Sequence, residues 1–350
     1  MAPDHRALAR ALEARIRGSG PFSGVAGLRL GGEERWTIAR GWASRQFRRR
    51  IRAGTSFGVA SVAKLFTSLA VGRLVAAGRL ALDDDVLPFV RDLLPALDPR
   101  IEVGHLLSHT SGMGDYFHEE IEGADYAELW QDRPCQRFVV PADFVPLFRD
   151  DPQVFPPGER FLYNNAAFIV LGLVVEAVTR ERFADVVRRE VVEAAGLTGS
   201  GYWRLDELPP GCATGYVDGP SGPRANFYSI PVASGPDGGV FTNLADLDLL
   251  WDALLSGSLL GRPVTEAWTA PVIARGPRSS ACRGFFATRR RLAVEGEPER
   301  DFYFTEGDDP GYRCFSVVSG DRSIRFTVLS NGGGGFWDLV DGCLDGLFEP

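Results

Sequence analysis

Lysine is almost missing from this chain. Of its 38 basic residues only one, Lys64, is a lysine, and all the others are arginine. Arginine keeps its proton near neutral pH, whereas a desolvated lysine can lose it. A chain that retains one amine among so many guanidinium groups indicates that position 64 needs a titratable group. The alternative is that one lysine survived by chance in an arginine-biased composition.

Cysteines are few, and their arrangement excludes the usual cysteine chemistry. The five cysteines are odd in number and widely spaced, and no CxxC pair occurs. This pattern argues against a disulfide framework and against a zinc site. We therefore expect free thiols, a cytoplasmic location, and neither a metal nor a cofactor. The cysteines are Cys135, Cys212, Cys282, Cys314 and Cys343.

Long apolar runs and a basic field are also absent. No stretch reaches the roughly 18 apolar residues of a membrane span, and the amino-terminal segment lacks the apolar core of a signal peptide. The net charge is -8, with acidic and basic residues mixed along the chain. We expect neither a nucleic acid nor a membrane as a partner, and the sequence leaves the oligomeric state open.

The order of expected elements indicates one mixed α/β (α+β) enzyme fold. Short strands are predicted near the amino terminus, helices and loops in the middle, and strands again near the carboxyl terminus. This order predicts an antiparallel sheet built from both termini, with a helical lobe inserted and the active site in the cleft between. The expected division is 1–78 plus 236–350 for the sheet domain and 79–235 for the helical domain.

The boundaries of these elements follow from hydrophobic periodicity and turn residues. Leu8, Leu12 and Ile16 share one face of an amino-terminal amphipathic helix. Strands are predicted at 24–30, 35–41, 284–294, 301–305, 313–319 and 323–330. Further helices are predicted at 166–178, 183–195, within 240–260, and at 336–348.

Ser61 and Lys64 stand three residues apart at a predicted helix start. That spacing places both side chains on one helical face. A serine hydroxyl becomes a good nucleophile when a nearby base takes its proton, and a desolvated lysine can be that base. The four-residue pattern alone is common, so its weight comes from holding the only lysine.

A second group of polar residues precedes the helix predicted at 166–178. Tyr163 and Asn165 follow the Pro156-Pro157-Gly158 turn. A phenol can relay protons, and an amide can bind a substrate carbonyl. Taken alone, the tyrosine is more typical of loop packing.

These two motifs together resemble the serine β-lactamase family, in the branch of class C enzymes, DD-peptidases and family VIII-type esterases. Other segments agree with this resemblance and occur in the same order. They are His105-Leu106-Leu107-Ser108-His109-Thr110-Ser111-Gly112, Pro157-Gly158-Glu159-Arg160-Phe161, Gly238-Gly239-Val240-Phe241-Thr242 with Asp246-Leu247, and Pro310-Gly311-Tyr312. The resemblance implies a β-lactamase/transpeptidase-like fold from about residue 20 to the end.

The resemblance also implies roles for the residues. Ser61 would be acylated, Lys64 and Tyr163 would share proton transfer, and Asn165 would orient the substrate. The backbone amides of Ser61 and Asp308 would hold the oxyanion. The acyl group of a small-molecule donor would then pass to water, an alcohol or an amine.

The third motif departs from the family pattern. The family has Lys-Thr-Gly or His-x-Gly where this chain has Thr305-Glu306-Gly307. Thr305 replaces the basic residue that the family has at this position, and the acidic residue Glu306 follows it. We therefore expect a substrate that is neutral or cationic near the reacting carbonyl, and not penicillin or peptidoglycan.

Other interpretations were weighed against this one. Gly54–Gly58 matches the GxSxG elbow, but the expected strand before it and the βαβ pattern are missing. His105 and His109 have metal-ligand spacing without a third ligand nearby, and ordering of a loop explains them better. Three functions stay open: a hydrolase, a dedicated acyltransferase of small-molecule biosynthesis, and a catalytically silent binding module.

Overall fold

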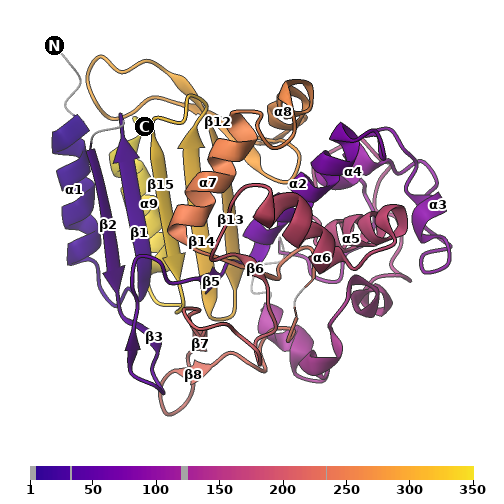
Figure 1. The fold of residues 1–350 in the computed structure, drawn as a ribbon, viewed down its shortest axis with the longest axis horizontal. Helices are drawn as coiled ribbons and strands as arrows, with labels where there is room; N and C mark the ends of the chain where they lie inside the picture. The colour runs from indigo at the N-terminus through magenta and orange to yellow at the C-terminus, as the bar shows by residue number, and fades with distance from the viewer. Residues whose placement is uncertain (1–4, 32–33, 120–124, 234) are drawn as a thin grey trace.

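An eight-stranded antiparallel sheet forms one side of the molecule, and most helices gather beside it (Figure 1). The computed structural model describes residues 5–31, 34–119, 125–233 and 235–350. The strand order is β10-β11-β12-β13-β14-β15-β1-β2. The strands are β1 (Gly24–Leu30), β2 (Glu34–Arg40), β10 (Ile273–Gly276), β11 (Ser279–Ala281), β12 (Phe286–Arg290), β13 (Arg300–Asp309), β14 (Tyr312–Ser319) and β15 (Arg325–Ser330).

The two ends of the chain meet in this sheet, as predicted. Strand β1 pairs with β2 on one side and with β15 on the other, so Val25 lies opposite Leu329. Such pairing joins residues about as far apart in sequence as the chain allows. The predicted antiparallel sheet built from both termini is therefore confirmed.

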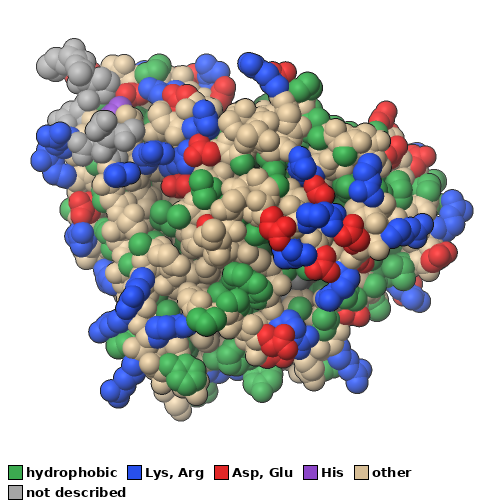
Figure 2. Space-filling model, in the orientation of Figure 1, with side chains coloured by type: hydrophobic (Ala, Val, Ile, Leu, Met, Phe, Trp, Pro, Cys, Tyr) green, Lys and Arg blue, Asp and Glu red, His purple; other side chains and the backbone are tan. Residues whose placement is uncertain are grey.

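Helices cover both faces of the sheet. Helix α1 (His5–Gly18) and helix α9 (Phe336–Leu347) pack together on one face. The predicted apolar face of α1 is buried there: Leu8, Leu12 and Ile16 belong to the core shared with α9. Helix α7 (Leu244–Leu255) packs on the opposite face, against β1 and β15. On the face of the molecule in Figure 2, basic and acidic side chains are interspersed.

The helices beside the sheet centre on α5 (Ala166–Thr179), whose first ten residues are all buried. It packs against helices α2 (Ala63–Ala76), α3 (Leu87–Val90), α4 (Val103–Leu107) and α6 (Phe183–Val187). Apolar residues all round a helix are typical of a fully enclosed one. The numerical division into 1–78 plus 236–350 and 79–235 stays a prediction.

Short elements complete the described chain. They are the helical turns η1 (Ala60–Val62), η2 (Tyr126–Trp130), η3 (Cys135–Arg137), η4 (Pro141–Leu147) and η5 (Arg188–Glu193), helix α8 (Arg262–Thr269), and strands β3 (Trp42–Ser44), β4 (Arg49–Arg50), β5 (Phe57–Gly58), β6 (Gly201–Tyr202), β7 (Tyr216–Val217), β8 (Arg224–Ala225) and β9 (Val240–Thr242).

Some of the observed elements differ from the predicted ones for physical reasons. The strand predicted at 301–305 continues to Asp309, because its last residues pair with β14 although their polar sequence does not alternate. The single helix predicted at 183–195 is α6 followed by the π-helical turn η5. Strands β10 and β11 were not predicted, since both are short and β10 is largely exposed.

Among the residues that the structure describes, every helix is too short or too polar to cross a lipid bilayer.

Candidate active site

Ser61 lies in the turn η1, between strand β5 and helix α2. The residue before it, Ala60, has φ 49°, in the left-handed region that residues with a side chain rarely adopt. Backbone strain of this kind persists only where the surrounding structure enforces it, and it is common at active sites. Ser61 is half-buried, so the turn presents a hydroxyl that a small molecule can reach.

Lys64 lies one turn further on, inside the protein. Its Nζ hydrogen-bonds Ser61 Oγ at 2.9 Å, Asn165 Oδ1 at 2.8 Å and the Asp237 carbonyl oxygen at 2.9 Å. Only 2% of the residue is exposed. Burial lowers the pKa of Lys64, and nearby carboxylates, first of all Asp237, only partly offset this effect. The amine can therefore lose its proton more easily than an exposed lysine.

The three partners of Lys64 suit both of its protonation states. An ammonium group donates three hydrogen bonds, one to each partner. A neutral amine donates two, which Asn165 and the Asp237 carbonyl can accept. Its lone pair is then free to accept the Ser61 proton. The geometry therefore lets Lys64 act as a base toward Ser61 without moving.

Tyr163 is held beside this pair by His109. The His109 ring stacks on the phenol ring, with centroids 4.5 Å apart. The residues on either side of Tyr163 both donate backbone hydrogen bonds to His109: Leu162 to its carbonyl oxygen at 2.9 Å, and Asn164 to its Nδ1 at 3.1 Å. Burial lowers the pKa of His109 well below its usual value, and the charges of Lys64 and Arg275 add to this.

The phenol of Tyr163 keeps its proton. Burial raises its pKa well above 10.0, the charge of Glu119 adds to this, and a hydrogen bond with Ser61 partly offsets it. Lys64 Nζ lies 5.0 Å from the centre of the ring. A raised pKa suits Tyr163 to donate a proton near neutral pH, and a lowered pKa makes Lys64 the better suited of the two to accept one.

Asn165 stands at the start of helix α5, where a buried carboxylate fixes it. Asp115 accepts the backbone N–H of Asn165 at 2.6 Å and that of Ala166 at 3.0 Å. Burial raises the pKa of Asp115 to about 7, against these hydrogen bonds. The Asn165 Nδ2 donates to Glu119 Oε1 at 3.3 Å. The amide thus lies between Lys64 and the acidic side chain of Glu119.

The second half of strand β13 forms the opposite wall. Strand β12 pairs with β13 only up to Phe304, so the segment Thr305–Asp309 has one edge without a strand neighbour. Gly307 lies against Ser61: a Cβ at this position would come within 2.8 Å of the Ser61 nitrogen and 2.4 Å of the Val59 oxygen. Only glycine fits so close an approach. The unpaired edge and the Ser61 amide therefore face one space.

The predicted residues of the third motif point in different directions. Thr305 is buried. The Asp308 carboxylate turns away from Ser61 to accept hydrogen bonds from Arg313 Nε at 2.8 Å and Trp337 Nε1 at 2.6 Å. This leaves the Asp308 backbone amide as the part that can serve a substrate. A cleft of about 590 Å³ opens beside Glu119 and Asp308.

Glu306 is paired with a cation that sequence reasoning missed. Its Oε1 lies 2.5 Å from Arg275 Nη2. The Arg275 side chain is 31% exposed and that of Glu306 is 30% exposed. The guanidinium of Arg275, from strand β10, stacks over Phe286 at 4.1 Å. A short exposed strand gives no sequence signal for this contact. A positive charge is therefore present at the edge of the site, but Glu306 neutralises it.

Further acids were also missed. Asp237 is buried and receives a hydrogen bond from the Tyr116 hydroxyl. Burial raises the pKa of Asp309, and the charge of Asp237 adds to this. Asp237 directly precedes the Gly238-Gly239 motif, and Asp309 directly precedes Pro310-Gly311, so only their positions next to predicted motifs could have drawn attention to them. The surroundings of Lys64 are consequently rich in carboxylates.

The structure thus brings Ser61, Lys64, Tyr163 and Asn165 into one cluster and places Gly307 against it. His105 lies elsewhere: its Nδ1 accepts the backbone N–H of Glu102 at 3.1 Å and caps helix α4. The two histidines therefore do not form a pair.

The sequence is similar to those of known proteins. A family model described as Beta-lactamase matches residues 9–341. Esterase EstB of Burkholderia gladioli is 34% identical over 211 residues, covering 58% of this chain and 53% of the esterase. Penicillin-binding protein 4* of Bacillus subtilis is 26% identical over 179 residues, covering 50% of this chain and 37% of that protein. The matches thus span about half or less of the length of these curated relatives.

Solved structures extend the likeness over nearly the whole chain. A penicillin binding protein from Bacillus halodurans is 35% identical, with a TM-score of 0.84, and the match covers 96% of this chain and 98% of that one. A D-stereospecific amidohydrolase from Streptomyces has the same fold at 23% identity, with a TM-score of 0.75 and coverage of 98% and 99%.

Proposed function

The chain belongs to the beta-lactamase family, and from that premise we propose that it forms an acyl-enzyme at Ser61 and passes the acyl group of a small ester or amide to water. One observation carries this proposal: Lys64, the only lysine, is buried with Nζ 2.9 Å from Ser61 Oγ. A buried amine at hydrogen-bond distance from a serine hydroxyl is the arrangement that activates a nucleophile.

The acylation step begins with neutral Lys64. Its lone pair takes the Ser61 proton while Ser61 Oγ forms a bond to the substrate carbonyl carbon. The carbonyl oxygen becomes an oxyanion, which the backbone N–H groups of Ser61 and Asp308 would stabilise. The oxyanion then re-forms the carbonyl and the bond to the leaving group breaks.

Tyr163 is suited to supply the proton that the leaving group needs. Its pKa is raised, so the phenol is protonated at neutral pH. It gives that proton to the departing alcohol or amine. The Lys64 ammonium group then returns a proton to the Tyr163 oxygen. Water then attacks the acyl carbon and gives a proton to neutral Lys64, the bond between that carbon and Ser61 Oγ breaks, and Lys64 returns the proton to Ser61 Oγ, so that the free acid leaves and Ser61 is restored. No proton or electron is left over.

The charges around the site favour an uncharged or cationic acyl donor. The carboxylates of Asp237, Glu119 and Asp309 act on Lys64, and Glu306 masks Arg275. A donor with its own carboxylate would have to be buried beside these acids, at a place where burial already raises the pKa values of Asp237, Glu119 and Asp309. Esters and amides whose acyl group is uncharged, or comes from an amino acid, fit this requirement. The names esterase and amidohydrolase among the similar proteins agree with it.

The test is intact-protein mass spectrometry with a panel of activated esters, thioesters, amino-acid amides and β-lactams, together with a fluorophosphonate. We expect an adduct on the wild type that is absent from Ser61→Ala. Turnover that survives in Ser61→Ala would contradict the assignment of the nucleophile. Absence of any adduct would favour a binding module in place of an enzyme.

A second candidate is transfer of the acyl group to an alcohol or amine, as in small-molecule biosynthesis. The open cleft of about 590 Å³ supports it, because it has room for an acceptor and its wall includes Glu119, which accepts from Asn165, and Asp308 of the proposed oxyanion site. Product analysis with amines and alcohols present decides between the two. Free acid alone at every acceptor concentration would reject the transferase.

A cytoplasmic location stays our prediction, supported by the five free, buried cysteines.

A further inference from the structure

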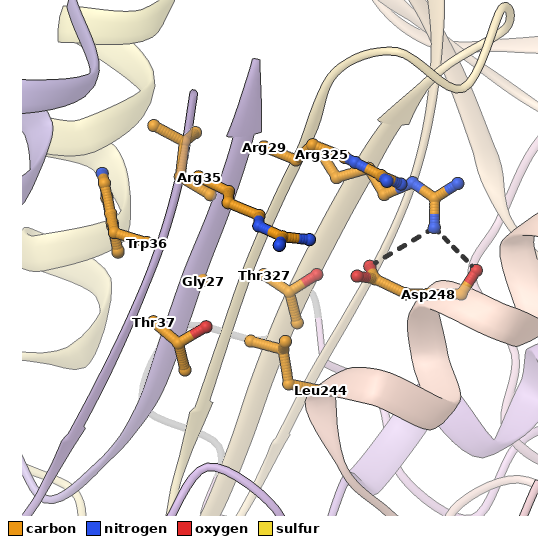
Figure 3. A pocket seen from close by; sticks show the side chains of 10 residues that line it. Gly27, Arg29, Arg35, Trp36, Thr37, Leu244, Asp248, Arg325 and Thr327 are labelled. Atoms are coloured by element: carbon orange, nitrogen blue, oxygen red, sulfur yellow. Dashed lines mark hydrogen bonds and ion pairs between the residues drawn. The ribbon is translucent and has the colours of Figure 1, made fainter. Parts of the chain in front are cut away.

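Away from Ser61, three arginines line a cavity of about 430 Å³ between helix α7 and the sheet. Arg35 comes from β2, Arg29 from β1 and Arg325 from β15, and Asp248 and Leu244 of α7 form the other wall (Figure 3). None of the residues proposed for acyl transfer lines this cavity.

Strand register places the three arginines in one row. Arg29 lies directly opposite Arg35 on one side and directly opposite Arg325 on the other. Two residues along the strands, Gly27 lies between Thr37 and Thr327 in the same way. Like charges directly opposite one another in a sheet are destabilising. Arg35 is exposed, but Arg29 is half-buried and Arg325 is buried, so water screens this repulsion only in part and negative charge close by would relieve it.

The described part of the chain supplies that charge mainly to one end of the row. Arg325 Nη1 donates to the Asp248 carbonyl oxygen at 2.8 Å and lies 3.7 Å from its carboxylate, and Nη2 pairs with Asp252. Asp252 is shared with Arg322 at 3.5 Å. Burial raises the pKa of Asp248, and the charge of Arg29 only partly offsets this effect.

Among the side chains that the structure describes, no carboxylate forms an ion pair with Arg29 or Arg35. Asp248 is the one acid among the described residues of the cavity wall, and it is already engaged by Arg325. Arg325 itself is 4% exposed, and its buried Nε has no hydrogen-bond acceptor in the described structure. Positive charge and unused donors therefore exceed what this part of the protein satisfies.

The shape of the cavity follows from Gly27. A Cβ at this position would lie 2.4 Å from Leu244 Cδ1, so the glycine lets α7 rest directly on β1. The space beside that contact, toward the arginines, stays open. Its volume is in the range of pockets that hold small ligands. Guanidinium groups bind phosphate and carboxylate oxygens in pairs of parallel hydrogen bonds.

We propose that the arginine row, defined as Arg29, Arg35 and Arg325, binds a small oxyanion that carries at least two negative charges, such as a diphosphate or a polycarboxylate. The ligand would lie beside the contact between Gly27 and Leu244, between the guanidinium groups of Arg29 and Arg35. It would offset the repulsion along the row and so stabilise the contact between α7 and the sheet. This site is independent of the acyl chemistry at Ser61.

Thermal unfolding of the whole protein tests this. Pyrophosphate and citrate are each titrated against sodium chloride at equal ionic strength. We expect one or both to raise the midpoint by about 3 °C at saturation, with sodium chloride giving less. Comparison of the two probes identifies phosphate or carboxylate as the preferred group. Calorimetric titration is expected to give one site per chain.

Arg29→Gln and Arg35→Gln are the informative variants. Arg91→Gln is the matched control, because Arg91 is an exposed arginine at the end of helix α3, far from the arginine row in sequence. We expect Arg29→Gln to weaken anion binding at least about tenfold, as loss of one paired charge would. The same change is expected to raise the midpoint in the absence of the anion, because it relieves repulsion.

Arg91→Gln is expected to keep the wild-type response. Equal midpoint shifts from the two anions and from sodium chloride would overturn the proposal, and so would an unchanged anion response in Arg29→Gln and Arg35→Gln. The row would then be a solvated polar face of the sheet.

Discussion

The two walls of the candidate active site differ in how firmly they are built. On the helical side, Lys64 and Asn165 are buried and joined to each other at 2.8 Å, and His109 holds the loop that carries Tyr163. On the strand side, Arg275 and Glu306 are about one-third exposed and contact each other across the sheet. The buried wall is suited to fix proton positions, and the exposed wall is suited to sort substrates by charge.

Lys64→Arg gives the sharpest test of the buried wall. Arginine keeps the positive charge but cannot lose it, so acylation by an activated ester is expected to fall at least about a thousandfold. Wild-type kcat/KM is expected to rise with pH toward a midpoint below 10.5, because burial lowers the pKa of Lys64. Stopped-flow acylation rates measure both effects, and an active Lys64→Arg enzyme would contradict the assigned base.

Asp115→Ala is expected to weaken the same wall by removing its anchor. Two buried backbone N–H groups at the start of α5 would lose their acceptor, at a cost of about 2–4 kcal/mol in the free energy of unfolding. Urea unfolding measures this. Asp115→Asn, which keeps one acceptor oxygen, is expected to lose less at pH 7.

The pH dependence of Asp115 has an unusual sign. Burial raises its pKa from 3.8 to about 7, so the folded state binds more protons than the unfolded state between these values. Its contribution to stability therefore falls as pH rises from 3.8 to about 7, and levels off above. The wild type is expected to lose stability relative to Asp115→Asn over that window. A constant difference between the two proteins would refute the raised pKa.

His109→Asn tests whether the phenol must be held. Loss of the stacked ring and of the acceptor for the Asn164 amide is expected to lower kcat about tenfold, with little change in KM. His105→Asn is the matched control, because His105 also accepts a backbone amide but does not touch Tyr163. A reduction of kcat in both variants, in proportion to lost stability, would reduce His109 to a purely structural role.

Glu306→Gln addresses the exposed wall and should have the smallest effect. Freeing Arg275 is expected to raise kcat/KM for an ester with a terminal carboxylate about fivefold relative to an uncharged ester of the same length. Arg275→Gln is expected to shift the ratio the opposite way. If both ratios match the wild type, this pair does not select the substrate.

The accuracy of sequence-based prediction also differs between the two walls. The membership of the family and the antiparallel sheet built from both ends are confirmed. The Ser61–Lys64 contact could be predicted because helical spacing alone brings residues three apart together. The third motif was located, but its strand was predicted too short and its partner Arg275 was missed, because cross-strand contacts leave no local pattern.

By itself, the sequence determined which chemistry is available. One lysine three residues after a serine, a tyrosine and asparagine before an apolar helix, and strands near both termini all follow from local spacing. Only the tertiary structure decided which charges come together, both beside this chemistry and away from it. Strand register places Arg29 between Arg35 and Arg325, and sheet packing brings Arg275 to Glu306. The physical reason is that register and packing join residues across long stretches of chain, whereas periodicity reports only on neighbours within one helix or strand.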